Sequence, residues 1–143
     1  LLVDGRGVPL SIIVTGANRH DVSQVAVVLD AIAVQRPAPP ERRSKHLCAD
    51  AGYTGAPALC AIEQHGYIPH VKGRGQEAAA KRRHPTQRAR RWVVEVAHSW
   101  FNRFRKLLVR YEKLEHSFLG LHHLAAAIIA FRKVPLAINI IYG

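Results

Sequence analysis

The spacing of apolar residues along the chain predicts an alternation of strands and helices. Apolar side chains recur every three or four positions in four segments, which we predict to be helices: 21–34, 56–65, 88–110 and 117–133. Short apolar runs bounded by turn-forming residues predict four strands: 1–3, 9–15, 46–49 and 67–71. This order of elements predicts an α/β fold, with strand–helix alternation in the middle of the chain.

The connections between these elements carry signals of their own. Asp4 and Gly5 lie between the first two strands and predict a hairpin, because glycine adopts a positive φ at little cost. Either Asn18 or Asp21 is suited to cap the first helix. Residues 72–87 are rich in Gly, Ala and Arg and have no periodicity, which predicts a basic loop.

The composition excludes several classes of protein. With 143 residues, 48% of them hydrophobic, the chain is long enough to bury a core, so global disorder is excluded. No apolar run reaches the roughly eighteen residues of a membrane-spanning helix, and two cysteines indicate a reducing compartment, the cytoplasm. The chain contains no methionine and begins within a predicted strand. We therefore expect a piece of a longer protein or the product of a second reading frame.

Positive charge is concentrated in one segment of the chain. The formal net charge is +11, yet residues 1–71 carry six basic and six acidic side chains. Residues 72–113 carry thirteen Lys or Arg side chains against three Glu. A neutral half joined to a strongly basic segment suggests a polyanionic partner, with nucleic acid first. A merely solvated basic surface is the alternative.

Asp50 is the first candidate for chemistry. It follows the predicted strand 46–49 and precedes a glycine-containing turn, so it lies where a strand opens into a loop. Ligand sites of open α/β sheets lie at such strand ends. An aspartate that merely caps a turn is the alternative interpretation.

Glu95 is the second candidate, within the arginine-rich predicted helix 88–110. Helical spacing places it on one polar face with Arg88, Arg91 and Asn102. The opposite face is an apolar stripe, formed by Val93, Val96, Trp100, Phe104 and Leu107. The alternative is an ion pair with an arginine on a solvated helix, which contributes only roughly a few tenths of a kcal/mol.

Asp50 and Glu95 together sharpen the hypothesis of a metal site. A strand-end aspartate and a helix glutamate, forty-five residues apart and flanked by arginines, can share divalent cations. Carboxylate oxygens suit Mg²⁺ or Mn²⁺, and two such ions about 3.5–4 Å apart stabilise the attacking and leaving oxygens of a phosphodiester displacement. Arginines on adjacent helical turns would hold DNA phosphates, because their planar forks match phosphate oxygens.

Four segments of the chain resemble a known family, the IS5 group of the IS4-like DDE insertion-sequence transposases. They match in order and spacing: LLVDGRGVPLSIIVTGANRHDV at the start, LCADAGYTG around Asp50, RRWVVEVAHSWFNRFRKLLVRYEKL around Glu95, and HHLAAAIIAFR near the end. The resemblance implies that residues 1–133 are the C-terminal part of an RNase H-like catalytic domain. In that reading 72–87 is a basic loop, 88–110 is the helix of the catalytic glutamate and 134–143 is a tail.

The resemblance also implies roles for single residues. Asp50 matches the aspartate of the family's A-D-x-G-Y segment, which is the second catalytic carboxylate. Glu95 matches the third catalytic carboxylate, in a helix with the signature Y-x2-R-x3-E-x6-K, and Arg91 matches the arginine of that signature. Both carboxylates are therefore expected to bind Mg²⁺ or Mn²⁺.

Two positions depart from the helix signature. Arg88 stands where the tyrosine is usual, and Asn102 stands where the lysine is usual. Arg103 or Lys106 would then have to supply a nearby cation. Contacts with DNA are expected from the following side chains: Arg88, Arg90, Arg91, Trp92, Arg103 and Lys106.

The family's first catalytic aspartate has no counterpart here, because its strand precedes the segment that matches Leu1. Asp4 matches the hairpin acid of the following segment instead. With two carboxylates we expect weak metal binding and no in-line geometry, so the chain alone is expected to be inactive. Some relatives divide their transposase between overlapping frames, so an upstream-frame polypeptide would supply the strand. A decayed copy is the other explanation.

The resemblance implies an activity and partners. The activity of the whole protein is metal-dependent DNA cleavage at the ends of an insertion sequence, followed by strand transfer into target DNA. The expected partners are the terminal inverted repeats, the target DNA and a second copy of the protein in a homodimer. The expected location is the bacterial cytoplasm, in association with the nucleoid. A non-catalytic DNA-binding remnant, built on the basic helix, is the alternative function.

A zinc site is the remaining alternative. His46, Cys48, Cys60 and His65 could contribute ligands, but their H-x-C and C-x4-H spacings are not those of common zinc fingers. Buried thiols and ordinary surface histidines are the simpler interpretation.

Overall fold

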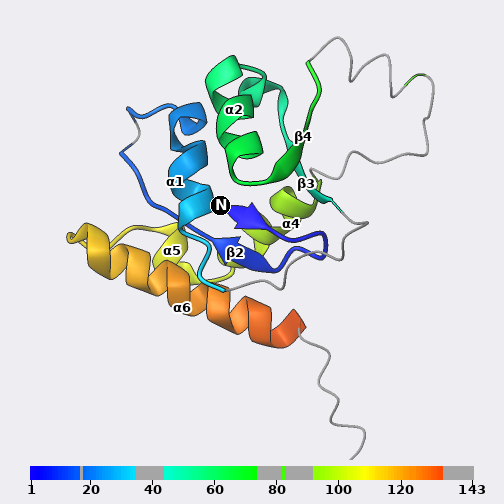
Figure 1. Cartoon of the computed structure of the whole chain (residues 1–143). Helices are drawn as coiled ribbons and strands as arrows, with labels where there is room; N and C mark the ends of the chain where they lie inside the picture. The colour runs from blue at the N-terminus through cyan, green and yellow to red at the C-terminus, as the bar shows by residue number, and fades with distance from the viewer. Residues whose placement is uncertain (17, 35–43, 74–81, 83–91, 134–143) are drawn as a thin grey trace, which may run out of the picture.

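The computed structural model of the chain describes residues 1–16, 18–34, 44–73, 82 and 92–133. Strands and helices alternate through the first half of the chain, and helices alone follow among residues 92–133, so the expected α/β class is confirmed (Figure 1). Most of the predicted basic loop 72–87 and all of the tail 134–143 lie outside the described residues. None of the helices described has the length and hydropathy needed to cross a bilayer.

The first sheet is an antiparallel pair of short strands, β1 (Leu2–Val3) and β2 (Pro9–Ser11). The second strand is shorter than the predicted 9–15, because β1 offers only two residues for pairing. The hydroxyl of Ser11 donates to the carbonyl oxygen of Val28 at 2.6 Å, which ties the sheet to the helix that follows. Ser11 is buried, so this bond satisfies its polar side chain.

The turn between β1 and β2 is organised by Asp4. Its Oδ1 accepts hydrogen bonds from the backbone N–H groups of Arg6 and Val8, both at 2.8 Å. The hairpin prediction is therefore confirmed, and Asp4 serves as a hairpin acid. The positive φ lies at Gly7 (+82°) and not at Gly5, so the predicted position of the left-handed residue was wrong.

The helix predicted over 21–34 is shorter and has two parts. A 3-10 helix, η1 (Asp21–Gln24), leads into α1 (Val25–Asp30), which buries Leu29. The predicted cap was also wrong: the N-cap position is His20, and it makes no side-chain cap bond. Asp21 is instead the first residue of η1, because the chain tightens into 3-10 geometry at this helix end.

The second sheet pairs β3 (Lys45–Ala49) with β4 (Tyr67–Val71) in parallel. Parallel neighbours need a crossover connection, and α2 (Ala56–Gln64) supplies it, beginning with a proline in its first turn. The helix buries Ile62 completely against Leu29 and Tyr67. The strand, helix and strand predicted for this region are thus confirmed.

Three helices complete the described chain: α4 (Trp92–Phe101), α5 (Arg105–Leu108) and α6 (Glu115–Lys133). The single helix predicted over 88–110 was wrong, because a turn follows α4. Asn102 is the first residue of that turn, and asparagine favours turns over helix interiors. The helix predicted over 117–133 is confirmed by α6.

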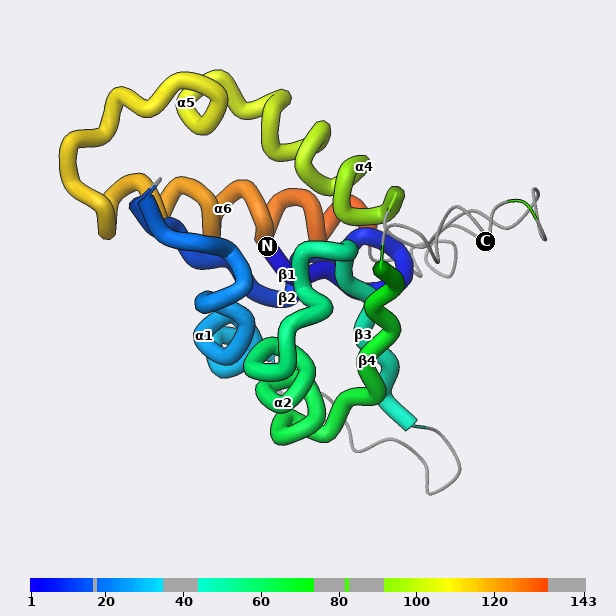
Figure 2. Tube along the Cα trace, turned by 90° about the horizontal axis from the view of Figure 1, so that it is seen from above, coloured from blue at the N-terminus to red at the C-terminus, as the bar shows by residue number. Residues whose placement is uncertain are grey.

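The last three helices form a second packed layer, in which α6 runs alongside α4 and α5 (Figures 1 and 2). Phe101, Ala125 and Ile129 are its buried core. Of the predicted apolar stripe, Trp100, Phe104 and Leu107 pack against this core. Val93 is buried beside Gly7 of the hairpin. The ammonium group of Lys133 lies 3.9 Å from the ring centroid of Trp100, which joins the end of α6 to α4.

Gly7 is where the hairpin meets α4, and its substitution tests this contact. A Cβ atom at Gly7 would lie 3.2 Å from the Trp100 ring and 3.3 Å from Val93, at a φ that other residues rarely adopt. We expect Gly7→Ala to lower the free energy of unfolding by about 1–3 kcal/mol in chemical denaturation. Gly5→Ala is the matched control, since Gly5 has no heavy atom within 4 Å of its Cβ position. Equal stabilities of the two variants would contradict the close approach.

Candidate functional site

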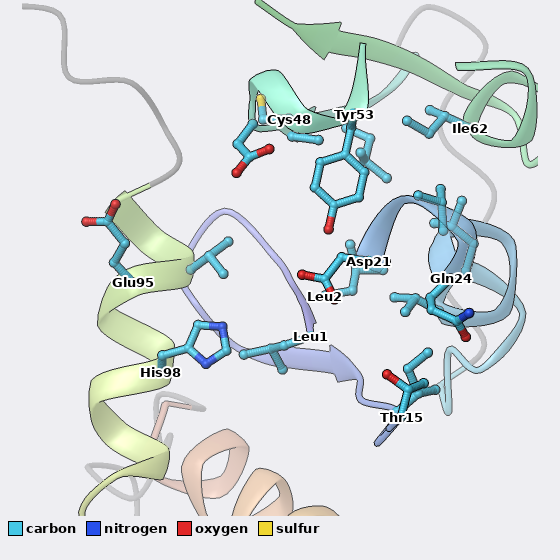
Figure 3. A pocket seen from close by; sticks show the side chains of 18 residues that line it. Leu1, Leu2, Thr15, Asp21, Gln24, Cys48, Tyr53, Ile62, Glu95 and His98 are labelled. Atoms are coloured by element: carbon cyan, nitrogen blue, oxygen red, sulfur yellow. The ribbon is translucent and has the colours of Figure 1, made fainter. Parts of the chain in front are cut away.

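A cavity of about 460 Å³ lies between the two sheets (Figure 3). The cavity is lined by side chains from both sheets, from η1 and α1, from α2 and from α4. Its apolar lining includes Leu2 from β1, Leu47 from β3, Leu29 from α1 and Ile62 from α2. This volume is within the range of about 300–1,000 Å³ that is usual for ligand sites.

The cavity brings Asp50 and Glu95 to one place, although forty-five residues separate them in the sequence. Asp50 follows the last residue of β3, as predicted, and Glu95 lies in the first turn of α4. Both side chains are exposed to solvent. The two carboxylates therefore belong to different walls of the same cavity.

Asp50 also caps a turn, as the alternative interpretation predicted. It occupies the N-cap position of a short 3-10 helix, η2 (Ala51–Tyr53), and its Oδ1 accepts a hydrogen bond from the N–H of Gly52 at 2.8 Å. An ionised carboxylate has about four acceptor positions. One cap bond fixes the orientation of the group and leaves it able to bind a cation.

Asp21 is a third acid in the cavity lining, and its place there was not predicted. It comes from η1, whereas the sequence analysis treated it only as a possible helix cap. Figure 3 shows the Tyr53 ring pointing toward it. Burial raises the pKa of the Tyr53 hydroxyl, and the negative charges of Asp21 and Asp50 raise it further. Tyr53 therefore lies within the field of two carboxylates of the cavity lining.

His98 is a further lining residue that sequence reasoning missed. It lies on α4 one turn after Glu95 and next to Leu1 (Figure 3). Burial lowers the pKa of its imidazole. A neutral imidazole can accept a proton, so His98 is chemically suited to act as a base. The helical pattern of the sequence alone does not distinguish His98 from other surface histidines.

The carboxylates of Asp50 and Glu95 are suitable ligands for a hard divalent cation, but two of them do not make a complete metal site. Carboxylate oxygens are the ligands that Mg²⁺ and Mn²⁺ prefer. Within the ranges that the structure describes, no group of three or more His, Cys, Asp or Glu side chains is placed to hold one metal ion. Asp50 and Glu95 therefore provide part of a metal site.

The zinc alternative is not supported by the arrangement of its four residues. The Nδ1 of His46 lies 2.7 Å from the Nε2 of His70, and the Nε2 of His65 lies 2.9 Å from the Oδ1 of Asp30. The expectation that the thiols are buried was wrong, since Cys48 and Cys60 are both exposed. They lie on different elements, β3 and α2.

The expected DNA contacts can be located only in part. Trp92 opens α4 with 47% of its surface exposed, and Arg103 and Lys106 are exposed in the turn after α4 and in α5. Asn102 lies beyond the end of α4, so it does not continue the helix face of Glu95 as predicted. Three further candidates lie outside the described residues: Arg88, Arg90 and Arg91.

Comparison with known proteins finds one family and a curated relative. Residues 47–132 match the family described as "Transposase DDE domain". The chain is also similar to a putative transposase for insertion sequence element IS402 from Burkholderia cepacia, with 34% identity over 116 residues. That alignment covers 79% of this chain and 52% of the relative, so the chain spans about half of the relative's length. No solved structure matches the chain.

The raised pKa of Tyr53 gives a direct test of the cavity's charge. Replacing Asp21 or Asp50 with asparagine removes a negative charge that opposes formation of tyrosinate, so each substitution should lower the Tyr53 pKa. The measurement is tyrosinate ultraviolet absorbance during alkaline titration, with Tyr53→Phe to assign the signal. Asp4→Asn, in the hairpin turn, is the control. If Asp21→Asn moves the titration no more than this control, Asp21 does not face the cavity.

Proposed function

The chain belongs to the DDE transposase family, and we propose that it is the part of an insertion-sequence transposase that carries the second and third catalytic carboxylates, Asp50 and Glu95. The observation that carries this proposal is that both residues line one cavity. The site at the end of β3 agrees with the position of ligand sites in α/β sheets. In this proposal the fold is RNase H-like, the subgroup is IS5 within the IS4-like transposases, and the partial catalytic domain spans 1–133.

The reaction proposed for the whole protein is a pair of phosphodiester displacements. In cleavage, a water oxygen attacks phosphorus at the element end, the bond to the 3′-oxygen breaks and a 3′-hydroxyl leaves. In strand transfer, that hydroxyl attacks a target phosphodiester and displaces its 3′-oxygen. Bound Mg²⁺ or Mn²⁺ supplies charge stabilisation to the attacking and leaving oxygens. Asp50 and Glu95 would hold the cations, with Asp50 oriented by the Gly52 N–H group.

Basic and aromatic residues around α4 would position the DNA. Arg103 and Lys106 are exposed and can contact phosphates, as would Arg91 and its arginine neighbours Arg88 and Arg90. Trp92 has enough exposed surface to stack on an unpaired base near a cleaved end. Substrate recognition thus combines phosphate contacts with one stacking surface.

The chain by itself is proposed to be inactive. It provides two of the family's three carboxylates, and the described residues assemble no group of three metal ligands. The first aspartate would come from a strand outside this sequence, encoded upstream in the same or an overlapping frame. The working protein would be a homodimer on two element ends, associated with the bacterial nucleoid.

A DNA-binding remnant without catalysis is the second candidate function. The observation in its favour is that Arg103 and Lys106 are exposed and do not line the cavity. The two candidates differ in the role of the acids. For a pure binder, loss of Asp50 or Glu95 leaves DNA affinity unchanged or increases it, since repulsion of phosphate falls.

Mn²⁺ binding tests the proposed metal site. We expect the chain to bind Mn²⁺ weakly, with Kd of roughly 10⁻⁴–10⁻³ M, as measured by electron paramagnetic resonance of the free ion. Asp50→Asn and Glu95→Gln should each weaken binding at least about tenfold, by removing a charged ligand. Glu63→Gln, an exposed acid on α2, is the matched control. The same affinity in all three variants would contradict a site built on Asp50 and Glu95.

The salt dependence of DNA binding tests the basic surface. Each phosphate contact adds about 0.9 to the slope of log Kd against log salt concentration, so Arg103→Ala and Lys106→Ala should each lower that slope by about one. The measurement is fluorescence anisotropy of a labelled duplex at several salt concentrations. Arg19→Ala, an exposed arginine near η1, serves as the control. A slope unchanged in both variants would show that these side chains do not contact phosphate.

A further inference from the structure

We propose that His46 and His70 form a two-histidine binding site for a transition-metal ion of the Ni²⁺, Cu²⁺ and Zn²⁺ class, on the exposed face of the β3–β4 sheet. Neither histidine lines the cavity that holds Asp50 and Glu95, so the site goes beyond the proposed function. It also differs from the zinc set considered from the sequence, which did not include His70.

The two imidazole rings face each other with their nitrogen atoms in contact. The Nδ1 of His46 lies 2.7 Å from the Nε2 of His70, and the ring centroids are 4.9 Å apart with planes inclined by 35°. Both side chains are exposed to solvent. A hydrogen bond between two imidazole nitrogens requires a lone pair on one of them. The pair is therefore an accessible arrangement of two nitrogens that both serve as metal ligands in proteins.

The separation of the two nitrogens is close to that of two ligands on one metal ion. Imidazole nitrogens bind Zn²⁺ at about 2.0–2.1 Å, so two of them at a right angle to the ion lie about 2.9 Å apart. The observed 2.7 Å has to open only slightly to reach this separation. Right angles occur in square-planar and octahedral coordination, which favours Cu²⁺ and Ni²⁺ over tetrahedral Zn²⁺.

A metal ion can replace the proton that the two rings share. The ring that donates the N–H group has to change to its other tautomer, with the proton on Nε2 of His46 or on Nδ1 of His70. Each neutral ring then offers one lone pair to the ion and keeps one N–H group for water. Binding to the neutral pair therefore needs no net release of protons.

The parallel pairing of β3 with β4 holds the two histidines in position. His70 is opposite Cys48 in the register, two residues after His46, so the histidines are diagonal neighbours on adjacent strands. Side chains alternate along a strand, and the opposite face carries Leu47 and Tyr67, which pack in the buried core around α2. Because this core fixes both backbones, metal binding has to order only two side chains, which lowers its cost.

The chemistry of the ligands separates this site from the carboxylates. Imidazole nitrogen suits Ni²⁺, Cu²⁺ and Zn²⁺, whereas Mg²⁺ prefers oxygen. Cys48 lies on the same face, but among the residues with described positions no three His, Cys, Asp or Glu side chains surround one point. We therefore assign the ion to the two histidines, with water in its other coordination positions. Both ligands belong to strands that pair with each other, so the site needs no residue from outside this sequence.

Ni²⁺ binding by the full, untagged chain tests the proposal. We expect isothermal titration calorimetry to detect binding, and His46→Gln and His70→Gln each to weaken it at least about tenfold, because one remaining imidazole loses the gain from two linked ligands. His123→Gln is the matched control, since His123 is an exposed histidine on α6. An excess of Mg²⁺ should not displace Ni²⁺.

Chemical modification locates the ion without any substitution. Diethyl pyrocarbonate reacts with the free lone pair of a neutral imidazole, and mass spectrometry identifies the modified residue. A metal-bound ring has no free lone pair, so at a free Ni²⁺ concentration of about ten times Kd, modification of His46 and His70 should slow about tenfold. Modification of His123 should be unchanged.

Three results would overturn the proposal. One is the absence of Ni²⁺ binding by the unsubstituted chain. The second is equal affinity in His46→Gln, His70→Gln and His123→Gln, or equal protection of all three histidines, which would indicate nonspecific binding. The third is loss of binding in Cys48→Ser, which would make the thiolate a ligand and contradict a site of two histidines alone.

Two variants separate this inference from the proposed function. The Asp50→Asn/Glu95→Gln double variant should keep Ni²⁺ binding and lose Mn²⁺ binding. His46→Gln should lose Ni²⁺ binding and keep Mn²⁺ binding. Loss of both ions in either variant would contradict two separate sites.

Discussion

The parallel pairing of β3 with β4 is the constraint on which the rest of the structure depends. Parallel strands cannot be joined by a tight turn, so α2 must cross between their ends and cover one face of the pair. Ile62 makes this cover stable, because it is buried completely against Leu29 and Tyr67. The pairing directs the carboxyl end of β3, and with it Asp50, toward the cavity.

The position of Glu95 depends on a different contact, between the hairpin turn and α4. Gly7 allows the turn to approach Trp100 and Val93 more closely than any larger residue would. Lys133 covers the Trp100 ring from the end of α6 and donates a hydrogen bond to the carbonyl oxygen of Arg6 at 3.3 Å. This layer holds α4 beside β1, and it thereby places Glu95 in the lining of the cavity that Asp50 also borders.

Charge is divided between the interior of the cavity and the outside of the helices. Burial raises the pKa of the Tyr53 hydroxyl, and the negative charges of Asp21 and Asp50 in the cavity lining raise it further. Arg103 and Lys106 are exposed outside this cavity and favour an anion. An enzyme that holds cations and a phosphodiester at once requires both kinds of surface, and a passive binder of DNA requires only the second.

The sequence by itself determined the features that arise from local periodicity. The alternation around β3, α2 and β4, the long helix α6, and the placement of Asp50 at a strand end all follow from the spacing of apolar residues over a few turns. Only the tertiary structure decided that the helix predicted over 88–110 stops at Phe101. It also decided that Asp21, Tyr53 and His98 line one cavity with Asp50 and Glu95. The reason is physical: periodicity reports which face of an element is buried, whereas a cavity is formed by packing between elements that are far apart along the chain.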